Sequence, residues 1–334
     1  MRTFSRWMAL GVLVCGPAAY ADRNDLQITQ LGNPNPFINS GSSVHSANFN
    51  PEANGDFRAF ARTFAAVITS TNLMPPETLG HAGFSINAEL GVIALPTRGP
   101  LDPLQGGPAQ DGQVTLPTER PQTPELLIPS VHVRKGLPFS LELGSRIGWI
   151  DRSSMFTATG ELKWAVNEGF TWLPDIGVRA HVTRLLGNKD FDLTAAGLDV
   201  GVGKQFPLGG MVTLTPYGGL DFVGVAASTD TLDFDQDRTA GTPLNPSNPY
   251  AGLDNTGVYE PVKLGENINS RIYGGVRFIG GALQLGAEIS LSNQGSIDVV
   301  RTNRPDGATQ VTTETRQRAL PAVFAFNATL GLDF

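Results

Sequence analysis

Alternation of apolar and polar residues runs through the chain from about residue 82 to residue 334. Residues 283–292 illustrate it, because their apolar side chains occupy every second position: Leu283, Leu285, Ala287, Ile289 and Leu291. Successive side chains of a β-strand point to opposite faces, so this period of two predicts strands with one apolar and one polar face. The pattern restricts the fold to one-sided sheets, either in a soluble sandwich or in a membrane barrel.

The segment lengths and the positions of the aromatic residues favour the membrane barrel. The segments run for about 10–14 residues, which is long for a sandwich and suits tilted strands that cross a bilayer. Aromatic side chains on the apolar face fall near the segment ends, where two interfacial girdles would lie. The predicted girdle residues are Phe139, Trp149, Phe156, Trp164, Phe222, Phe278, Phe324 and Phe334.

Charged and polar side chains gather on the opposite face of the same segments, which a salt-bridged or water-filled lumen tolerates. We expect the following residues to line that lumen: Glu89, His132, Arg134, Glu142, Arg146, Glu161, Lys163, Arg179, His181, Asp199, Asp221, Arg271, Arg277 and Glu288. Pairs of opposite charge across the lumen would indicate a plugged barrel, whereas a continuous stripe of one sign would indicate conduction.

Ten strands are predicted in a closed antiparallel barrel, so the fold class is all-β with an N-terminal helical segment. Their ranges are 82–95, 125–134, 138–150, 154–166, 174–186, 191–204, 211–226, 266–278, 282–293 and 319–334. The long connections 96–124, 227–265 and 294–318 all fall at one end, as expected for outer loops opposite short periplasmic turns. A further pair within 296–317 would give twelve strands. Pro129 and Pro216 predict bulges or bends, because each removes a ladder donor.

The end of the chain resembles Gram-negative outer-membrane β-barrels. Alternating Phe326, Ala328, Leu330 and Leu332 end on the aromatic residue Phe334, like the assembly signal of that class. The resemblance covers residues 82–334 as a pattern. It implies a location in the outer membrane, contact with outer-membrane lipid and recognition of Phe334 by the barrel-assembly machinery.

The first residues predict export. Arg2 and Arg6 precede an apolar run, and small residues at Ala19 and Ala21 suit a signal peptidase, so residues 1–21 are interpreted as a cleaved signal peptide. The alternatives are a membrane anchor, for which the apolar run is short, and a lipoprotein cut before Cys15, where Val14 is a poor match. Removing two arginines takes the net charge from −7 to −9, and this acidity argues against nucleic-acid binding.

Residues 22–81 do not alternate and form a separate N-terminal segment ahead of the barrel at 82–334. Apolar residues recur at helical spacing from Phe57 to Ile68, so an amphipathic helix capped by Asp56 and running to Ser70 is expected before Pro75. The helix would enter the barrel as a plug, cap the periplasmic mouth, or lie on the inner leaflet.

Few residues suggest chemistry. His132 and His181 lie on different predicted strands, and no spacing indicates a nucleophile with its base, a cofactor site or a paired-histidine metal site, so no enzyme is predicted. Asp233, Asp235 and Asp237 alternate and form a weak candidate for a hard cation such as calcium; a solvated acidic loop is the simpler interpretation.

Two functional classes follow. The first is a passive channel or transporter for small solutes, in which lumen charges tune selectivity. The second is a structural or surface-interaction barrel with an occluded lumen and binding by its outer loops. Ten strands leave little lumen once side chains fill it, which favours the second class, whereas the glycines on the lumen face favour the first. The passive channel or transporter is the predicted function, and the occluded barrel is its alternative. An outer-membrane hydrolase is a third, less favoured alternative.

Overall fold

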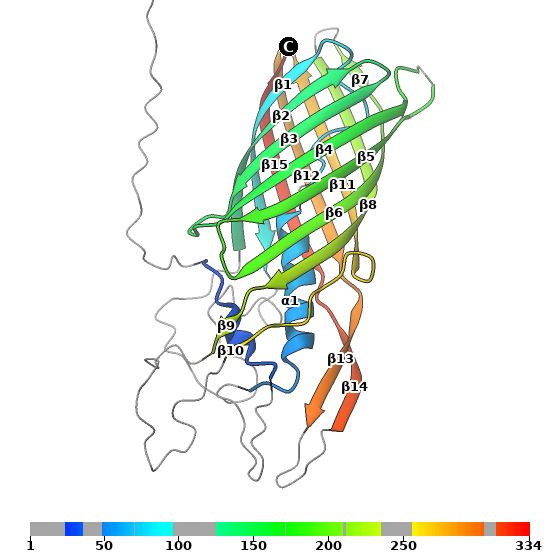
Figure 1. The fold of residues 1–334 in the computed structure, drawn as a ribbon. Helices are drawn as coiled ribbons and strands as arrows, with labels where there is room; N and C mark the ends of the chain where they lie inside the picture. The colour runs from blue at the N-terminus through cyan, green and yellow to red at the C-terminus, as the bar shows by residue number, and fades with distance from the viewer. Residues whose placement is uncertain are drawn as a thin grey trace, which may run out of the picture.

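The computed structural model describes residues 24–35, 49–69, 71–95, 125–170, 172–209, 212–234, 256–303 and 312–334. Its main feature is a closed antiparallel barrel of ten strands (Figure 1). These strands are β1 (Phe84–Ala94), β2 (Glu125–Leu137), β3 (Leu141–Trp149), β4 (Phe156–Asn167), β5 (Asp175–Leu186), β6 (Phe191–Gly203), β8 (Val212–Thr229), β11 (Ile268–Gly280), β12 (Leu283–Asn293) and β15 (Val323–Asp333). Each of the ten predicted strands therefore exists, with bounds shifted by up to four residues.

The barrel closes between the first and last of these strands. β1 pairs with β15, and Phe84 and Phe334 exchange backbone hydrogen bonds of 2.9 and 2.8 Å. The start of β1 and the C-terminus therefore lie at the same end of the barrel, here called the C-terminal end. The strand ends that the long connections join, such as Ala94 of β1 and Glu125 of β2, lie at the opposite end, here called the loop end (Figure 1).

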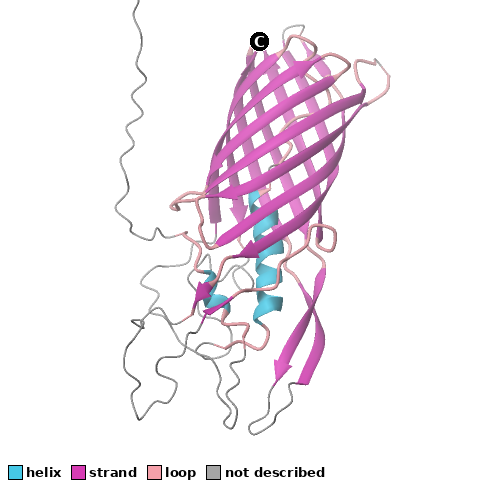
Figure 2. Cartoon of the chain, in the orientation of Figure 1, coloured by secondary structure: helices cyan, strands magenta, loops and turns pink. Residues whose placement is uncertain are grey.

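Shorter elements decorate the barrel. β7 (Phe206–Leu208) folds back on β8 at the C-terminal end, and β9 (Leu232–Asp233) pairs with β10 (Thr256–Gly257). β13 (Ser296–Asn303) and β14 (Thr312–Ala319) form a separate two-stranded sheet beyond the loop end (Figure 2). The strand pair that could have raised the count to twelve therefore exists, but it lies outside the barrel.

The two prolines do not cause the predicted bulges. Pro129 pairs in register with Leu90, and Pro216 pairs in register with Val276. Pro129 lies one residue beyond the last pair of the β2–β3 ladder, and Pro216 lies one residue beyond the last pair of the β6–β8 ladder. On that side, the missing N–H of each proline therefore leaves no ladder partner unpaired. Among the barrel's described strand pairs, a register shift occurs between Ala165 and Asn167.

The N-terminal helix differs from its predicted bounds. α1 spans Ala53–Ile68, so it begins before Asp56, and Asp56 lies in its first turn rather than at the N-cap. A turn at Asn50 starts the helix instead, because Asn50 Oδ1 accepts from the Glu52 N–H at 3.0 Å. The predicted last residue, Ser70, lies outside the described residues. Among those residues, no helix is both long and apolar enough to span a membrane.

α1 enters the loop end of the barrel along its axis (Figure 2), not the C-terminal end where a periplasmic cap was considered. Its apolar stripe is fully buried through Phe57, Phe60 and Phe64, which pack around Phe191 of β6. Phe57 also stacks on Tyr259 with ring centroids 4.8 Å apart. The helical spacing of these phenylalanines therefore supplies a core for the loop end.

That core also holds the start of the described chain. The short 3₁₀ helix η1 (Ile28–Leu31) buries Ile28 and Leu31 in it. The Tyr259 hydroxyl donates to the carbonyl of Gly32 at 2.7 Å, and burial raises the pKa of this hydroxyl. We refer to η1, α1, β9, β10, β13 and β14 together as the outer cap.

The outward face of the barrel is apolar at mid-height and aromatic near both ends. Phe139, Trp164, Phe278 and Phe334 are exposed toward the C-terminal end, and Trp149, Phe156, Phe222 and Phe324 are exposed toward the loop end. Phe139 lies in the β2–β3 turn with φ of 66° rather than within a strand. Trp172 and Phe206 extend the C-terminal group and were missed, because Trp172 lies in the β4–β5 connection and Phe206 in the short strand β7, both outside the alternating pattern.

A charge placed on the outward face tests whether that face meets lipid. Leu162→Arg, midway along β4, should lower the free energy of unfolding in lipid by about 2–4 kcal/mol. Leu208→Arg, in the short strand β7 at the C-terminal end, is the matched control and should cost at most about 1 kcal/mol. Urea unfolding in vesicles, followed by tryptophan fluorescence, measures both; equal costs would argue against a lipid-facing belt.

Candidate functional site: the filled lumen

All fourteen residues predicted to line the lumen are buried, each with at most 8% of its surface exposed. They point inward because they occupy alternate positions on strands whose other face is exposed. Six are carboxylates, six are arginine or lysine, and two are histidine. The interior is therefore balanced in charge rather than lined by a stripe of one sign.

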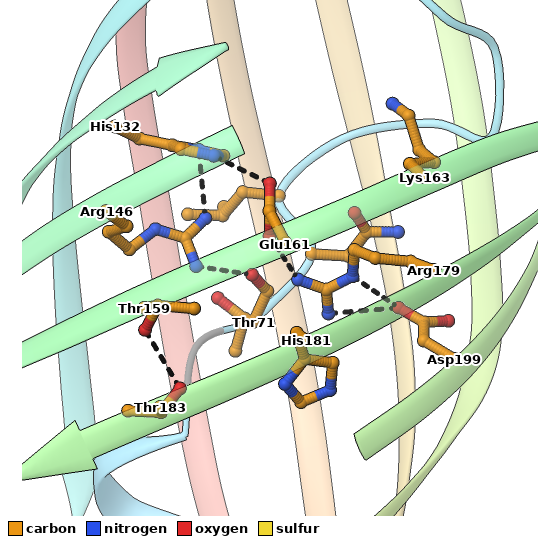
Figure 3. A network of polar contacts seen from close by, with 12 residues as sticks. Thr71, His132, Arg146, Thr159, Glu161, Lys163, Arg179, His181, Thr183 and Asp199 are labelled. Atoms are coloured by element: carbon orange, nitrogen blue, oxygen red, sulfur yellow. Dashed lines mark hydrogen bonds and ion pairs between the residues drawn. The ribbon is translucent and has the colours of Figure 1, made fainter. Parts of the chain in front are cut away.

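A chain of ion pairs joins lumen side chains from five strands, β1, β2, β4, β5 and β6, and Figure 3 shows its part from His132 to Asp199. Glu161 lies at its centre, with Oε1 2.7 Å from His132 Nε2 and Oε2 accepting from Arg179 Nη1 at 2.8 Å. His132 Nδ1 lies 2.9 Å from Glu89, and Arg179 continues to Asp199 at 3.0 Å. Charged groups so deeply buried are tolerated because each carboxylate meets a cation or an imidazole.

Strand register brings some of the charged lumen residues together. Glu142 lies directly opposite Lys163, and their charged atoms are 3.0 Å apart. Arg179 lies opposite Asp199 in the same way. Directly opposed side chains on one face of an antiparallel pair are close enough to interact, so these two complementary pairs help to neutralise the lumen. Like charges are also opposed, Lys163 to Arg179 and Asp199 to Asp221, and they are balanced by partners on other strands.

Further ion pairs extend this network toward both ends of the lumen. Asp221 lies 3.0 Å from His181 Nε2 and also pairs with Arg271, which is opposite it in register. Arg134 donates to Glu142 at 3.1 Å nearer the C-terminal end. The predicted lumen residues therefore form connected clusters rather than isolated charges.

The residues between α1 and β1 thread the lumen and were not predicted as site residues. We call residues 71–81 the strap; they carry no helix or strand and run from the end of α1 to the C-terminal end. At that end, an added Cβ at Gly136 would clash with the carbonyl of Gly80, so the chain passes directly against β2. The only sequence signal for the strap was its lack of alternation.

Lumen side chains bind the main chain of the strap and of the α1 terminus along its length. Arg146 donates to the Thr71 carbonyl at 2.9 Å, and Arg271 donates to the Thr69 carbonyl at 3.0 Å. Glu288 accepts from the Leu73 N–H at 2.8 Å. Further along, Lys163 Nζ donates to the Pro75 carbonyl at 3.4 Å, and Glu142 accepts from the Leu79 N–H at 3.0 Å. Glu168, just after the end of β4, accepts from the Thr78 N–H at 3.0 Å.

The strap also supplies a charge that the strands lack. Arg277, on β11, pairs with Glu77 of the strap. Glycines on the lumen face make room for the strap at this level, since an added Cβ at Gly177 or Gly203 would lie 2.8 Å from atoms of Pro76. The barrel wall is thus shaped around the segment that it holds.

Arg62 fixes the helix at the loop end. Its guanidinium donates to the Ile268 carbonyl at 2.7 Å, to the Gln294 carbonyl, and to the Asn269 amide at 3.2 Å. In return, the Asn269 amide donates to the Arg62 carbonyl at 2.8 Å. These partners are neutral, and burial lowers the pKa of Arg62. The arrangement ties α1 to the ends of β11 and β12.

Little space remains beside the helix and strap. A cavity of about 50 Å³ lies past the last turn of α1, lined by polar residues that include Glu89, Arg146, Thr159 and Asn327. A buried water needs roughly 10–15 Å³ of such volume, so the cavity has room for a few waters. It does not provide an open path for solutes.

The two lumen histidines pair with carboxylates. Within the described part of the chain, both ring nitrogens of His132 face carboxylates, and His181 Nε2 faces Asp221. Neither imidazole hydrogen-bonds to a serine or threonine hydroxyl there, which a nucleophile and base require. The described residues also contain no cluster of three or more metal-binding side chains. Asp233 lies on β9, whereas Asp235 and Asp237 lie outside the described residues.

A closed antiparallel barrel that is apolar outside and charged within defines the class of this chain. Its fold is a closed ten-strand antiparallel β-barrel with an apolar outer face and a charged lumen, which is the architecture of outer-membrane barrels. No family model matches the sequence, and no curated protein matches it.

Solved outer-membrane proteins share parts of the fold at low identity. Neisserial surface protein A is 11% identical, with 75% of this chain and 97% of that chain covered and a TM-score of 0.26. Ail, the attachment invasion locus protein of Yersinia pestis, is 9% identical, covering 76% and 99%, with a TM-score of 0.25. The β-domain of the Bordetella autotransporter BrkA is 11% identical, covering 76% and 100%, with a TM-score of 0.34. Such low values carry no argument about what this chain does.

Removing one charge from the lumen network tests its contribution to stability. Glu161→Ala leaves Arg179 and His132 with one carboxylate each, and should lower the free energy of unfolding by about 3–5 kcal/mol. Asp192→Ala is the matched control, because it breaks a pair of the same 2.8 Å length whose side chains are more than half exposed. The control should cost less than about 1 kcal/mol. Urea titration in lipid measures both variants, and similar losses would contradict a buried network.

Proposed function

We propose that the protein is an occluded outer-membrane barrel that anchors a folded cap on the outer side of the membrane. Its role is structural or surface interaction, with any binding carried by the outer cap and loops. One observation carries the proposal: α1 and the strap lie in the lumen and are bound by its side chains from the loop end to the C-terminal end, and the cavity beside the last turn of α1 measures only about 50 Å³. Balanced lumen charges support it as well, because a conducting pore would expose them to water.

The outer cap supports the same interpretation, because it has more internal structure than connecting loops need. Arg318, on β14, donates to Glu52 at 2.8 Å and pairs with Asp56 in the first turn of α1. Val299, on β13, packs against Gly55. Buried contacts therefore join the hairpin, the helix and the barrel, and hold the exposed face of β14 in a fixed position.

A gated transporter for small solutes is the second candidate. Hydrogen bonds and ion pairs, which water can replace, hold the strap in addition to the burial of Leu73 and Met74. If a ligand displaced the strap, the charged wall would then line a pore. The passive, permanently open channel is the form of this function that the filled lumen disfavours.

The proposal assigns no catalytic residue and no cofactor. Its partners are outer-membrane lipid on the apolar belt and, during assembly, the barrel-assembly machinery at the exposed Phe334. Export by a cleaved segment at residues 1–21 is part of the proposal, since the outer membrane lies beyond the inner one.

Single-channel recording in planar bilayers tests the occlusion. The intact mature protein should be silent, and a variant lacking residues 24–81 should conduct, because the deletion removes α1 and the strap. Heat-modifiable migration on a gel establishes that each protein has folded. Steady conductance by the intact protein would overturn the proposal.

A disulfide provides the control if the deletion variant does not fold. An added Cβ at Gly177 would lie 3.0 Å from the Cβ of Pro76, so Pro76→Cys with Gly177→Cys can be oxidised after a small adjustment. Brief openings that vanish on oxidation and return on reduction would identify strap displacement and favour the gated transporter. Silence in both redox states, with the disulfide formed, supports permanent occlusion.

A further inference from the structure

The two ends of the N-terminal segment lie on opposite sides of the barrel. At the loop end, the Asn24 N–H donates to the Arg152 carbonyl at 2.8 Å, and the carboxylate of Asp25 accepts from the Ser154 N–H at 2.8 Å. At the C-terminal end, Gly136 donates to the Gly83 carbonyl at 2.9 Å. Between these points the chain passes through the lumen as α1 and the strap (Figure 1).

The direction of this passage is unusual for an exported chain. Long connections belong outside the cell and short turns in the periplasm, so the loop end faces outward. A chain released from the inner membrane begins in the periplasm, yet residues 24–35 lie at the loop end. The region ahead of α1 must therefore cross the outer membrane during assembly.

The lumen is suited to hold such a passing chain. Its side chains contact six main-chain groups: the carbonyls of Thr69, Thr71 and Pro75 and the N–H groups of Leu73, Thr78 and Leu79. Every residue other than proline carries the same main-chain donor and acceptor, so this mode of binding tolerates changes of sequence. The lumen presents both acceptors and donors, as carboxylates and guanidinium groups, and these can bind the N–H and carbonyl groups of successive peptide units.

We propose that the lumen is a binding channel for one extended polypeptide, and that it carries the chain's own N-terminal segment to the outer side. A peptide joined ahead of Asn24 is then displayed outside as well. The driving force is the set of contacts made on arrival: burial of Ile28, Leu31 and Phe57 in the outer cap, and the hydrogen bonds of the strap. The proposal uses the outward direction of the loop end and does not depend on whether the lumen conducts.

Cysteine labelling of intact cells tests this with single exposed residues. The predicted mature chain contains no cysteine, so Gln27→Cys and His81→Cys each provide one thiol, at opposite ends of the threaded segment. A membrane-impermeant maleimide should label Gln27→Cys on intact cells and should label His81→Cys only after the outer membrane is permeabilised. Lys263→Cys, exposed at the loop end, is the outer control.

Labelling of both ends from outside, or of neither, would overturn the proposal. Since all three positions are exposed, the substitutions leave the core intact, and heat-modifiable migration identifies folded molecules. Conductance by the intact protein would refute the occluded function yet leave this pattern of labelling unchanged, so the two proposals fail separately.

A fused epitope tests the carrier role with the complete chain. An unstructured epitope placed between the signal segment and Asn24 should be cleaved by external protease on intact cells. The matched control carries the same epitope after Gly209, an exposed turn at the C-terminal end, and should be protected until permeabilisation. Protection of the N-terminal epitope in intact cells, with the barrel folded, would contradict display.

Discussion

Closure between β1 and β15 is the constraint on which the rest of the structure depends. Lipid offers no hydrogen-bond partners, so every strand must find a neighbour on both sides, and only a closed sheet provides that. Closure encloses whatever the strands carry on their inner face. Here that face carries charge, and a ten-strand barrel is narrow, so each buried charge must meet a partner inside. The chain solves this with complementary charges at paired positions, such as Lys163 opposite Glu142.

The strap provides hydrogen-bond and ion-pair partners for charged residues that have no ion-pair partner on the described part of the barrel wall. Glu288, on β12, has no ion-pair partner among the described wall residues, and it accepts instead from the Leu73 N–H and, at 3.1 Å, from the Tyr217 hydroxyl. Arg277 pairs with Glu77 of the strap. The wall and the strap are therefore one polar unit. Removing the strap would leave buried groups unpaired, and each such group costs free energy comparable to a lost hydrogen bond or more.

The sequence was sufficient to predict the features that depend on the alternation of apolar and polar residues within one strand. The ten strands, their inward polar residues and their outward aromatic residues all follow from a period of two, which acts within a single strand. The charge partners could not be predicted in the same way. His132 and Glu161 lie two strands apart, and their contact depends on register and barrel curvature, which are set by the whole sheet.

The N-terminal segment was harder to predict for a different reason. The phenylalanine spacing predicted α1, but a helix of 16 residues with one apolar face can pack at either mouth of a barrel. What places it at the loop end is the set of contacts with Phe191 and Tyr259, which are far away in sequence. The strap has no periodicity, and its partners lie on strands that follow it in the chain. Its lumen path is therefore a property of the tertiary structure alone.

Hydrogen exchange of the strap amides tests the central claim, that the chain fills its own lumen, most directly. The Leu73, Thr78 and Leu79 N–H groups donate to Glu288, Glu168 and Glu142. In the refolded protein in lipid, the account predicts that these amides exchange as slowly as amides of the barrel strands, because their release requires the strap to leave its partners. Exchange as fast as in an unstructured peptide, with the strand amides protected, would contradict it.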